Sequence, residues 1–395
     1  MSNRPLSGLR VLDFSRVLAG PYATRMLSDL GADVLKIEPP EGDVTRHFGK
    51  LPEGMSGYYM QNNLGKRNIC IDLKAEGARA LILDLVAKAD MVVENFRPGV
   101  MEKFGIGWKA LSAVNPKLVM VSISGFGQDG PDRARAAYAP IIHAESGVLA
   151  RQARTTGHPP ADIMFSMADT FSALHGLVGA FAALTMAERT GKGQHVDIAM
   201  ISAMHATDDF APYILDGVWP VGNESLVWQA PEGKQILVSG ELKWLWHVYS
   251  NQAGLKADVP ADADVPTKIA ARRAKLAERF AGHDRFQALT DELDALNLPW
   301  GLVRDVGEEA FDQPTLKADK MIVDLKDDAG NPRRAVQSPY KFSDATSGID
   351  ESTRAPMRGE HNVEALQDWL GWSHDQVATL AAEGVLRSEE DTADG

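Results

Sequence analysis

Short strand-like runs and helix-like runs alternate along the first 125 residues, and this alternation constrains the fold more than any other feature of the chain. From residue 9, "LRVLDF" has the pattern of a buried strand, "PYATRMLSDLGA" that of a helix and "DVLKIE" that of a second strand. Pro21 falls in the first turn expected for this helix, and Gly31 falls at its end. Because alternating strands and helices need crossovers over the faces of a sheet, the pattern predicts a parallel sheet flanked by helices.

The same rhythm continues beyond this opening. Further strands are expected at "RNICIDL", "DMVVENF" and "KLVMVSISGFG", and further helices at 75–89, 99–114 and 167–188. Beyond about residue 215 the pattern changes to mixed runs such as "KQILVSGEL" and "PTKIAARRAKLAERFAGH". We therefore expect an α/β protein whose large Rossmann-like domain comprises 1–205 plus 335–395. A smaller α+β domain is expected at 225–325, with linkers at 206–224 and 326–334.

Charge and cysteine content exclude several classes of protein. The chain has 54 acidic and 41 basic residues, a net charge of −13, so no overall field favours nucleic acid or an anionic membrane. Cys70 is the single cysteine and lies in the apolar run "NICIDL", which predicts a buried strand thiol and excludes a disulfide framework. The ten histidines show no ligand spacing, so we expect no metal site.

The apolar runs favour a cytoplasmic protein without a membrane partner. The start, "MSNRPLSGLRVLDF", contains no apolar core behind a basic segment. The longest apolar run, at 173–187, is interpreted as a core helix too short to span a bilayer. Localisation in the cytoplasm is the resulting expectation.

Two local motifs have a chemical as well as a structural interpretation. In "FSMADTFSALHG", Ser166 and Asp169 have the spacing of a capping box, in which the hydroxyl covers a backbone N–H and the carboxylate lies at the positive helix end. The segment "SISGFGQDGP" at 122–131 is rich in glycine and follows a strand, where open α/β sheets bind ligands. Helix capping and a surface turn remain the alternatives to a catalytic carboxylate and a binding loop.

Several long blocks of the sequence resemble the class III coenzyme A transferases. This family includes formyl-CoA transferase, carnitine CoA-transferase and the α-methylacyl-CoA racemases. The blocks include "GLRVLDFSRVLAGPYATRMLSDLGADVLKIEPPEGD" at 8–43 and "ADTFSALHGLVGAFAAL" at 168–184, with further agreement at 63–74, 92–107 and 359–373. The resemblance implies transfer of coenzyme A (CoA) from an acyl-CoA thioester to a small free carboxylic acid. Asp169 would form the covalent intermediates, and no cofactor beyond CoA as substrate is needed.

The resemblance also assigns CoA-binding positions. They follow the expected strands of the large domain and comprise Val17, Leu18, Ile71, Asp72, Leu73, Lys74, Asn95, Phe96, Arg97, Lys103 and Tyr138. Arginine and lysine suit the phosphates of CoA. Pro39 stands where the transferase pattern often has an arginine.

Substrate, assembly and an alternative reaction follow from the same resemblance. At 217–234 the chain reads "GVWPVGNESLVWQAPEGK", where formyl-CoA transferase has consecutive glycines, so we expect a dicarboxylic or branched acid pair. An interlocked homodimer is implied. Racemisation beside the thioester is an alternative, but Tyr138 occupies the place of the racemase histidine and His143, interpreted as an unpaired core residue, lies five positions later. A non-catalytic CoA-binding protein is the third interpretation, and Glu145 is the competing carboxylate.

Overall fold

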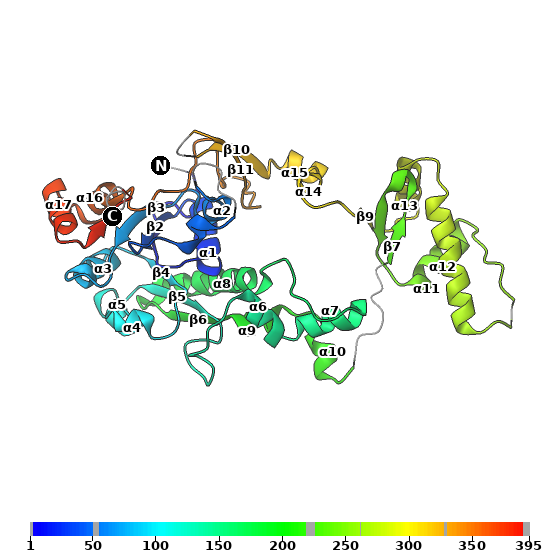
Figure 1. The fold of residues 1–395 in the computed structure, drawn as a ribbon, viewed down its shortest axis with the longest axis horizontal. Helices are drawn as coiled ribbons and strands as arrows, with labels where there is room; N and C mark the ends of the chain where they lie inside the picture. The colour runs from blue at the N-terminus through cyan, green and yellow to red at the C-terminus, as the bar shows by residue number, and fades with distance from the viewer. Residues whose placement is uncertain (1–2, 50–54, 219–225, 261, 328–329, 390–395) are drawn as a thin grey trace. The chain divides into compact units, whose positions relative to one another are not determined.

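The computed structural model describes residues 3–49, 55–218, 226–260, 262–327 and 330–389. It divides the chain into two compact units, one formed by Met1–Asp208 with Ala318–Gly395 and the other by Asp209–Lys317 (Figure 1). Within the first expected linker, residues 219–225 lie outside the described residues. The range 326–334, expected to be the second linker, overlaps an antiparallel hairpin of β10 (Ile322–Lys326) and β11 (Pro332–Val336).

A seven-stranded sheet forms the centre of the large unit, which confirms the expected α/β class. Its strand order is β12-β3-β2-β1-β4-β5-β6. The strands are β1 (Arg10–Asp13), β2 (Asp33–Glu38), β3 (Arg67–Ile71), β4 (Met91–Glu94), β5 (Val119–Ser124), β6 (His195–Ala199) and β12 (Leu386–Arg387). All neighbours pair in parallel except β12, which is antiparallel to β3. The order reverses between β1 and β4, and such switch points bind ligands at the carboxyl ends of the strands.

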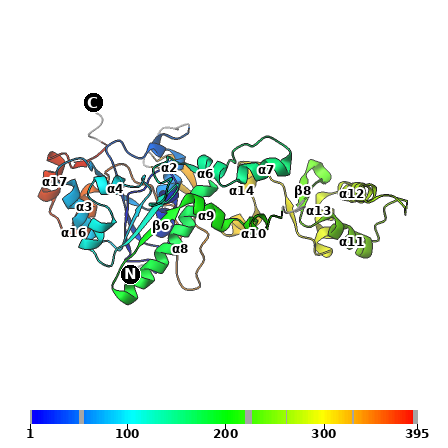
Figure 2. The same cartoon turned by 90° about the horizontal axis from the view of Figure 1, so that it is seen from below.

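Helices cover both faces of this sheet (Figures 1 and 2). Apolar side chains pack one face against α1 (Ala19–Asp29), α6 (Ala139–Glu145), α8 (Met167–Thr190) and α9 (Met200–Thr207). The opposite face packs against α3 (Ala78–Val86), α4 (Val100–Lys103), α5 (Trp108–Val114), α16 (Asn362–Leu370) and α17 (His374–Ala382). The remaining elements of this unit are η1 (Val44–His47), α2 (Gly57–Asn63) and α7 (Val148–Thr156). Helix α15 (Pro314–Ala318) crosses the boundary at which the chain passes from the small unit to the large one.

The helix expected over 99–114 is two helices. Gly105 has φ +69°, a left-handed conformation that interrupts the helix between α4 and α5. The other expected helices are present with ends shifted by a few residues, since 75–89 forms α3 and 167–188 forms α8.

The structure also corrects the length of the longest apolar segment. By length and composition alone, α8 could span a membrane, because the helix extends beyond both ends of the 173–187 run and is 24 residues long in total. A core helix of a soluble protein passes the same test. Here α8 packs on β5, β6, α1 and α9, with Ala168, Ala173 and Ala180 buried in the interface.

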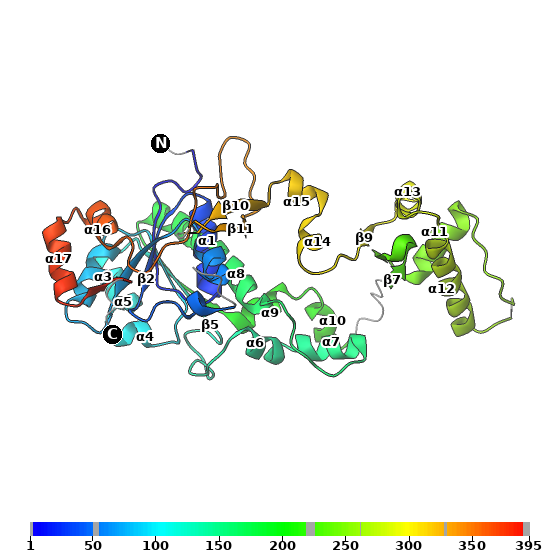
Figure 3. The ribbon, with the colours of Figure 1, turned by 45° about the horizontal axis from the view of Figure 1, so that its top comes forward.

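The small unit combines an antiparallel sheet with helices, as expected for an α+β domain. Its sheet has the order β7 (Leu226–Gln229), β8 (Gln235–Val238), β9 (Trp300–Leu302). Helices α11 (Leu242–Gln252), α12 (Val265–Ala281) and α13 (Phe286–Ala295) lie beside this sheet (Figure 3). The other helical elements between Asp209 and Lys317 include α10 (Ala211–Leu215), η2 (Pro231–Gly233) and α14 (Glu308–Phe311). Its core includes Trp228 and Phe280, whose rings meet edge to face at 5.0 Å.

Fully buried charges lie under the loop that joins β1 to α1. The Lys66 Nζ atom donates to Asp13 Oδ2 at 2.9 Å, and Lys36 Nζ donates to the Ser15 carbonyl at 2.8 Å and to Asp43 at 3.3 Å. Burial alone would raise the pKa of Asp13, but Lys66, Lys36 and two hydroxyl donors lower it to about 2. The pairing therefore outweighs the desolvation of Asp13, whereas burial still lowers the pKa of Lys66 to about 8.

Replacing Asp13 should reveal how strongly this cluster stabilises the fold. We expect Asp13→Ala to lower the free energy of unfolding by about 3–5 kcal/mol at neutral pH, because Lys66 would lose its buried partner. Asp84→Ala, on the exposed side of α3, should change it by less than about 0.5 kcal/mol. Urea unfolding measures both.

The pH dependence gives a second check. Since the folded-state pKa of Asp13 lies below its ordinary value of 3.8, its stabilisation is present above pH 4 and is lost as the pH falls towards 2. Equal losses of unfolding free energy in Asp13→Ala and Asp84→Ala would contradict a stabilising role for the buried charges around Asp13.

Candidate functional site

Three loops at the carboxyl ends of β1, β4 and β5 surround a cavity of about 110 Å³ that contains Asp169. The loop after β1 contributes Arg16 and Val17, and the loop after β4 contributes Asn95 to Pro98. The third wall runs from Ser124 to Tyr138. The cavity thus lies where strand order predicts a ligand site.

The β1–α1 loop has a strained conformation held by its neighbours. Val17 has φ +69°, which is costly for a β-branched residue. The Arg16 N–H donates to Asn95 Oδ1 at 2.8 Å, Asn95 Nδ2 donates to the Arg16 carbonyl at 2.7 Å, and the Val17 N–H donates to Asp43 at 3.2 Å. A Cβ on Gly20 would lie 2.1 Å from the Cβ of Ser15, so this position in the first turn of α1 requires glycine. Such enforced strain is typical of functional loops.

The Asp169 side chain belongs to α8 but faces the start of α1. It lies in the first turn of α8, and its carboxylate accepts a hydrogen bond from the backbone N–H of Ala19, the first residue of α1. Burial raises the pKa of Asp169 to about 6, although Ala19 and nearby His143 favour the ionised form. The group is therefore ionised at neutral pH and poorly solvated, a state that suits a nucleophile.

The expected capping box does not form. Ser166 is the N-cap residue of α8, but its side chain makes no capping hydrogen bond. The imidazole of His143 serves instead, because its Nε2 lies 3.3 Å from the Ala168 N–H and its Nδ1 lies 2.9 Å from Asp162 Oδ1. A proton on Nδ1 satisfies both contacts. His143 is buried and paired, which corrects its interpretation as an unpaired core residue.

Tyr58 is a further neighbour of Asp169 that sequence patterns did not identify. It lies at the start of α2, 38% exposed, with its ring 5.5 Å from that of Phe48. Burial, with the nearby carboxylates of Asp169 and Asp43, raises the pKa of Tyr58 to about 12. Its hydroxyl therefore stays protonated and can donate a hydrogen bond near the carboxylate.

A second, more apolar cavity of about 490 Å³ lies beside the first. Its walls include Ile71, Asp72, Leu73 and Lys74 after β3, and Pro39 after β2. It shares Arg16, Phe96 and Arg97 with the Asp169 cavity, and the guanidinium of Arg16 lies 5.6 Å from the centre of the Phe96 ring. Residues predicted from four separate loops are thus brought into two adjoining cavities.

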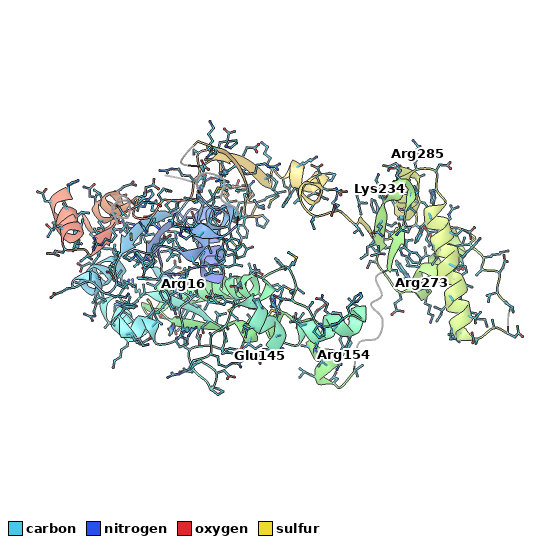
Figure 4. All side chains as sticks on the ribbon, viewed as in Figure 1. Arg16, Glu145, Arg154, Lys234, Arg273 and Arg285 are labelled. Carbon is cyan, nitrogen blue, oxygen red and sulfur yellow. The ribbon has the colours of Figure 1, made fainter. Side chains whose placement is uncertain are left out.

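The remaining predicted residues have different positions. Tyr138 is exposed and lines the Asp169 cavity. Leu18, the N-cap of α1, and Lys103, exposed on α4, do not line either of the two cavities. Their contacts with CoA stay predictions. Glu145, the competing carboxylate, lies at the end of α6 and accepts a hydrogen bond from Arg135. Figure 4 labels Glu145, and it shows Arg16 beside the sheet. In the described part of the chain, no three His, Cys, Asp or Glu side chains gather as a metal site.

Known proteins resemble the chain over nearly its whole length. The model of CoA-transferase family III matches residues 6–362. A succinyl-CoA–D-citramalate CoA-transferase of Chloroflexus aurantiacus is 32% identical over 97% of this chain and 98% of its own. A succinate–glutarate CoA-transferase of Agrobacterium fabrum is 34% identical over 93% and 97%, respectively. The crystal structure of a CAIB/BAIF family protein from Brucella suis superposes with TM-score 0.77 and 32% identity, covering 93% of this chain and all of the other.

Substitutions at His143 and Ser166 separate the observed cap of α8 from the expected one. We expect His143→Leu to lower the free energy of unfolding by about 1–3 kcal/mol, because the Ala168 N–H would lose its buried acceptor. Ser166→Ala should change it by less than about 0.5 kcal/mol. His143→Gln can present an acceptor oxygen near the position of Nε2 and should recover part of the loss.

Denaturant unfolding of the three variants provides the measurement. A larger loss in Ser166→Ala than in His143→Leu would mean that the serine caps the helix in solution.

Proposed function

The chain belongs to CoA-transferase family III, and on that premise we propose that it transfers CoA from an acyl-CoA thioester to a free carboxylic acid through covalent intermediates on Asp169. The supporting observation is the state of Asp169, a partly buried carboxylate with a pKa of about 6 in a cavity that adjoins a larger one suited to CoA.

The proposed reaction begins with two acyl transfers. An oxygen of Asp169 attacks the thioester carbonyl and the C–S bond breaks. The CoA thiolate departs, and the acyl group remains on Asp169 as an aspartyl–acyl mixed anhydride. The thiolate then attacks the Asp169 carbonyl carbon of this anhydride. The donor acid departs as a carboxylate, and an aspartyl–CoA thioester remains.

The acceptor acid repeats these steps in reverse. Its carboxylate attacks the aspartyl thioester, which releases the thiolate and forms a second anhydride. The thiolate attacks the acceptor carbonyl, so the new acyl-CoA leaves and Asp169 is regenerated. Charge and redox state balance over the cycle, so we propose CoA as the sole coenzyme, acting as a substrate.

The larger cavity provides the proposed position for CoA. Phe96, Phe104 and Leu73 offer apolar surface for the adenine ring, and Arg16, Lys74 and Arg97 offer cations for the phosphates. Because Arg16 and Arg97 line both cavities, they mark a route from the phosphates to Asp169.

The acid pair and the assembly are also proposals. The two relatives described above are named for succinyl-CoA with D-citramalate and for succinate with glutarate, so acids of this kind are candidate substrates. Racemisation is disfavoured because a tyrosine, Tyr138, stands at the place of the racemase histidine and the Nε2 lone pair of His143 is engaged by Ala168. The interlocked homodimer, the cytoplasmic location and the lack of nucleic-acid or membrane partners stay predictions.

The nucleophile can be tested by separating stability from activity. We expect Asp169→Asn and Asp169→Ala to lose CoA transfer by roughly 10³-fold or more. At pH 7 Asp169→Asn should be at least as stable as the wild type, because a raised folded-state pKa means that the ionised carboxylate opposes folding above about pH 4. Rates with succinyl-, acetyl- and formyl-CoA donors and urea unfolding provide the data.

Chemical trapping makes the test of the intermediate direct. Wild type treated with acyl-CoA and then hydroxylamine should carry the modification at Asp169, as identified by peptide mass spectrometry. Substantial activity in Asp169→Ala, or modification at Glu145, would overturn the mechanism.

The CoA position can be tested by charge reversal. We expect Arg97→Glu to raise the Kd for CoA by roughly 10- to 100-fold, since a cation beside a phosphate becomes an anion. Lys88→Glu makes the same change before β4, at the opposite end of the sheet, and should leave the Kd unchanged. Calorimetry with CoA that shows equal effects of the two substitutions would contradict the proposed position.

A further inference from the structure

The Asp169 cavity contains polar groups that the transfer chemistry proposed above does not use. They lie on the wall formed by Ser124 and the segment that follows it, across from the loops after β1 and β4. Arg16 and Arg97, on those two loops, also line the larger cavity, so we assign them to CoA. Arg133 and Arg135 line the Asp169 cavity but not the larger cavity.

Ser124 is a buried hydroxyl without a partner. It is the last residue of β5 and only 7% exposed, and its Oγ makes no hydrogen bond with any of the described residues. Buried polar groups in proteins are nearly always hydrogen-bonded, so an unpaired hydroxyl in a cavity wall indicates that a ligand atom completes it.

The two arginines differ in their availability. The guanidinium of Arg135 bonds to Glu145, lies 3.6 Å from Asp132, and stands 4.5 Å from the centre of the Phe126 ring. These contacts fix Arg135 as part of the wall. Arg133 is an exposed side chain of the cavity wall that makes no ion pair with any residue of the described ranges, so its charge is available to a ligand.

We propose that Arg133 and Ser124 form a subsite for the second carboxylate of a short dicarboxylic acceptor acid. The inference rests on the proposed function. In that reaction one carboxylate of the acceptor must reach Asp169, so an unpaired cation elsewhere in the same cavity matches a second anionic group. A guanidinium fork and a hydroxyl donor together suit carboxylate oxygens. A cavity of about 110 Å³ suits an acid with a short carbon chain.

A competition between two acids of equal chain length tests this subsite. Enzyme, succinyl-CoA and equal concentrations of glutarate and pentanoate are mixed, and the initial ratio of glutaryl-CoA to pentanoyl-CoA is measured by mass spectrometry. Because both acids compete for one donor in one mixture, changes in donor use cancel in the ratio. We expect wild type to favour glutarate by roughly 10- to 100-fold, as one charged hydrogen-bonded contact allows.

Variants assign the preference to residues. Arg133→Gln should bring the ratio close to one, and Ser124→Ala should reduce it by a smaller factor. Arg189→Gln is the matched control, an exposed arginine of α8 about 30 Å along the helix from Asp169, and should keep the wild-type ratio.

The outcomes distinguish the subsite from the function on which it rests. Comparable amounts of both products from wild type, or an unchanged ratio in Arg133→Gln, would overturn the subsite while transfer itself stands. No transfer to either acid from succinyl-, acetyl- or formyl-CoA would instead overturn the proposed function, and the subsite with it.

Discussion

A buried set of paired charges beneath the β1–α1 loop is the constraint on which the site depends. Asp13 accepts from Lys66, Thr24 and Ser15, while Lys36 holds the Ser15 carbonyl. An unpaired charge at this depth would cost several kcal/mol, so these residues maintain one arrangement together. The loop above them therefore keeps the strained turn at Val17 and starts α1 at Ala19.

The start of α1 in turn determines the chemistry available to Asp169. The backbone N–H of Ala19 and the positive end of the helix favour the carboxylate, whereas burial opposes it, and the balance is a pKa of about 6. His143 holds the start of α8, the helix that carries Asp169, by accepting a hydrogen bond from the Ala168 N–H. A group that is ionised at neutral pH but weakly solvated can attack a thioester without first losing a full hydration shell.

The fold was largely predictable, and the site only partly so. Hydrophobic periodicity predicted the strands from β1 to β5 and the helices α1 and α8, because these elements bury regular faces. It missed the break at Gly105 and the antiparallel pairing of β12 with β3, which depend on one backbone angle and on a partner some 300 residues away. The resemblance supplied Asp169 and the predicted CoA positions. Ser124 lies in the glycine-rich segment at 122–131, whereas Tyr58 and Arg133 had no sequence signal.

The sequence by itself determined the class of fold, because hydrophobic periodicity is a local pattern along the chain. It also determined the family and the candidate nucleophile, through the resemblance of long blocks of sequence. Tertiary structure alone decided how Asp169 is held. Ser166 has the spacing of a cap, yet His143 takes that role, and Ala19, 150 residues before Asp169, donates to the carboxylate. The physical reason is that burial and hydrogen bonding act between neighbours in space, and packing of α1, α6 and α8 on one face of the sheet makes these residues neighbours.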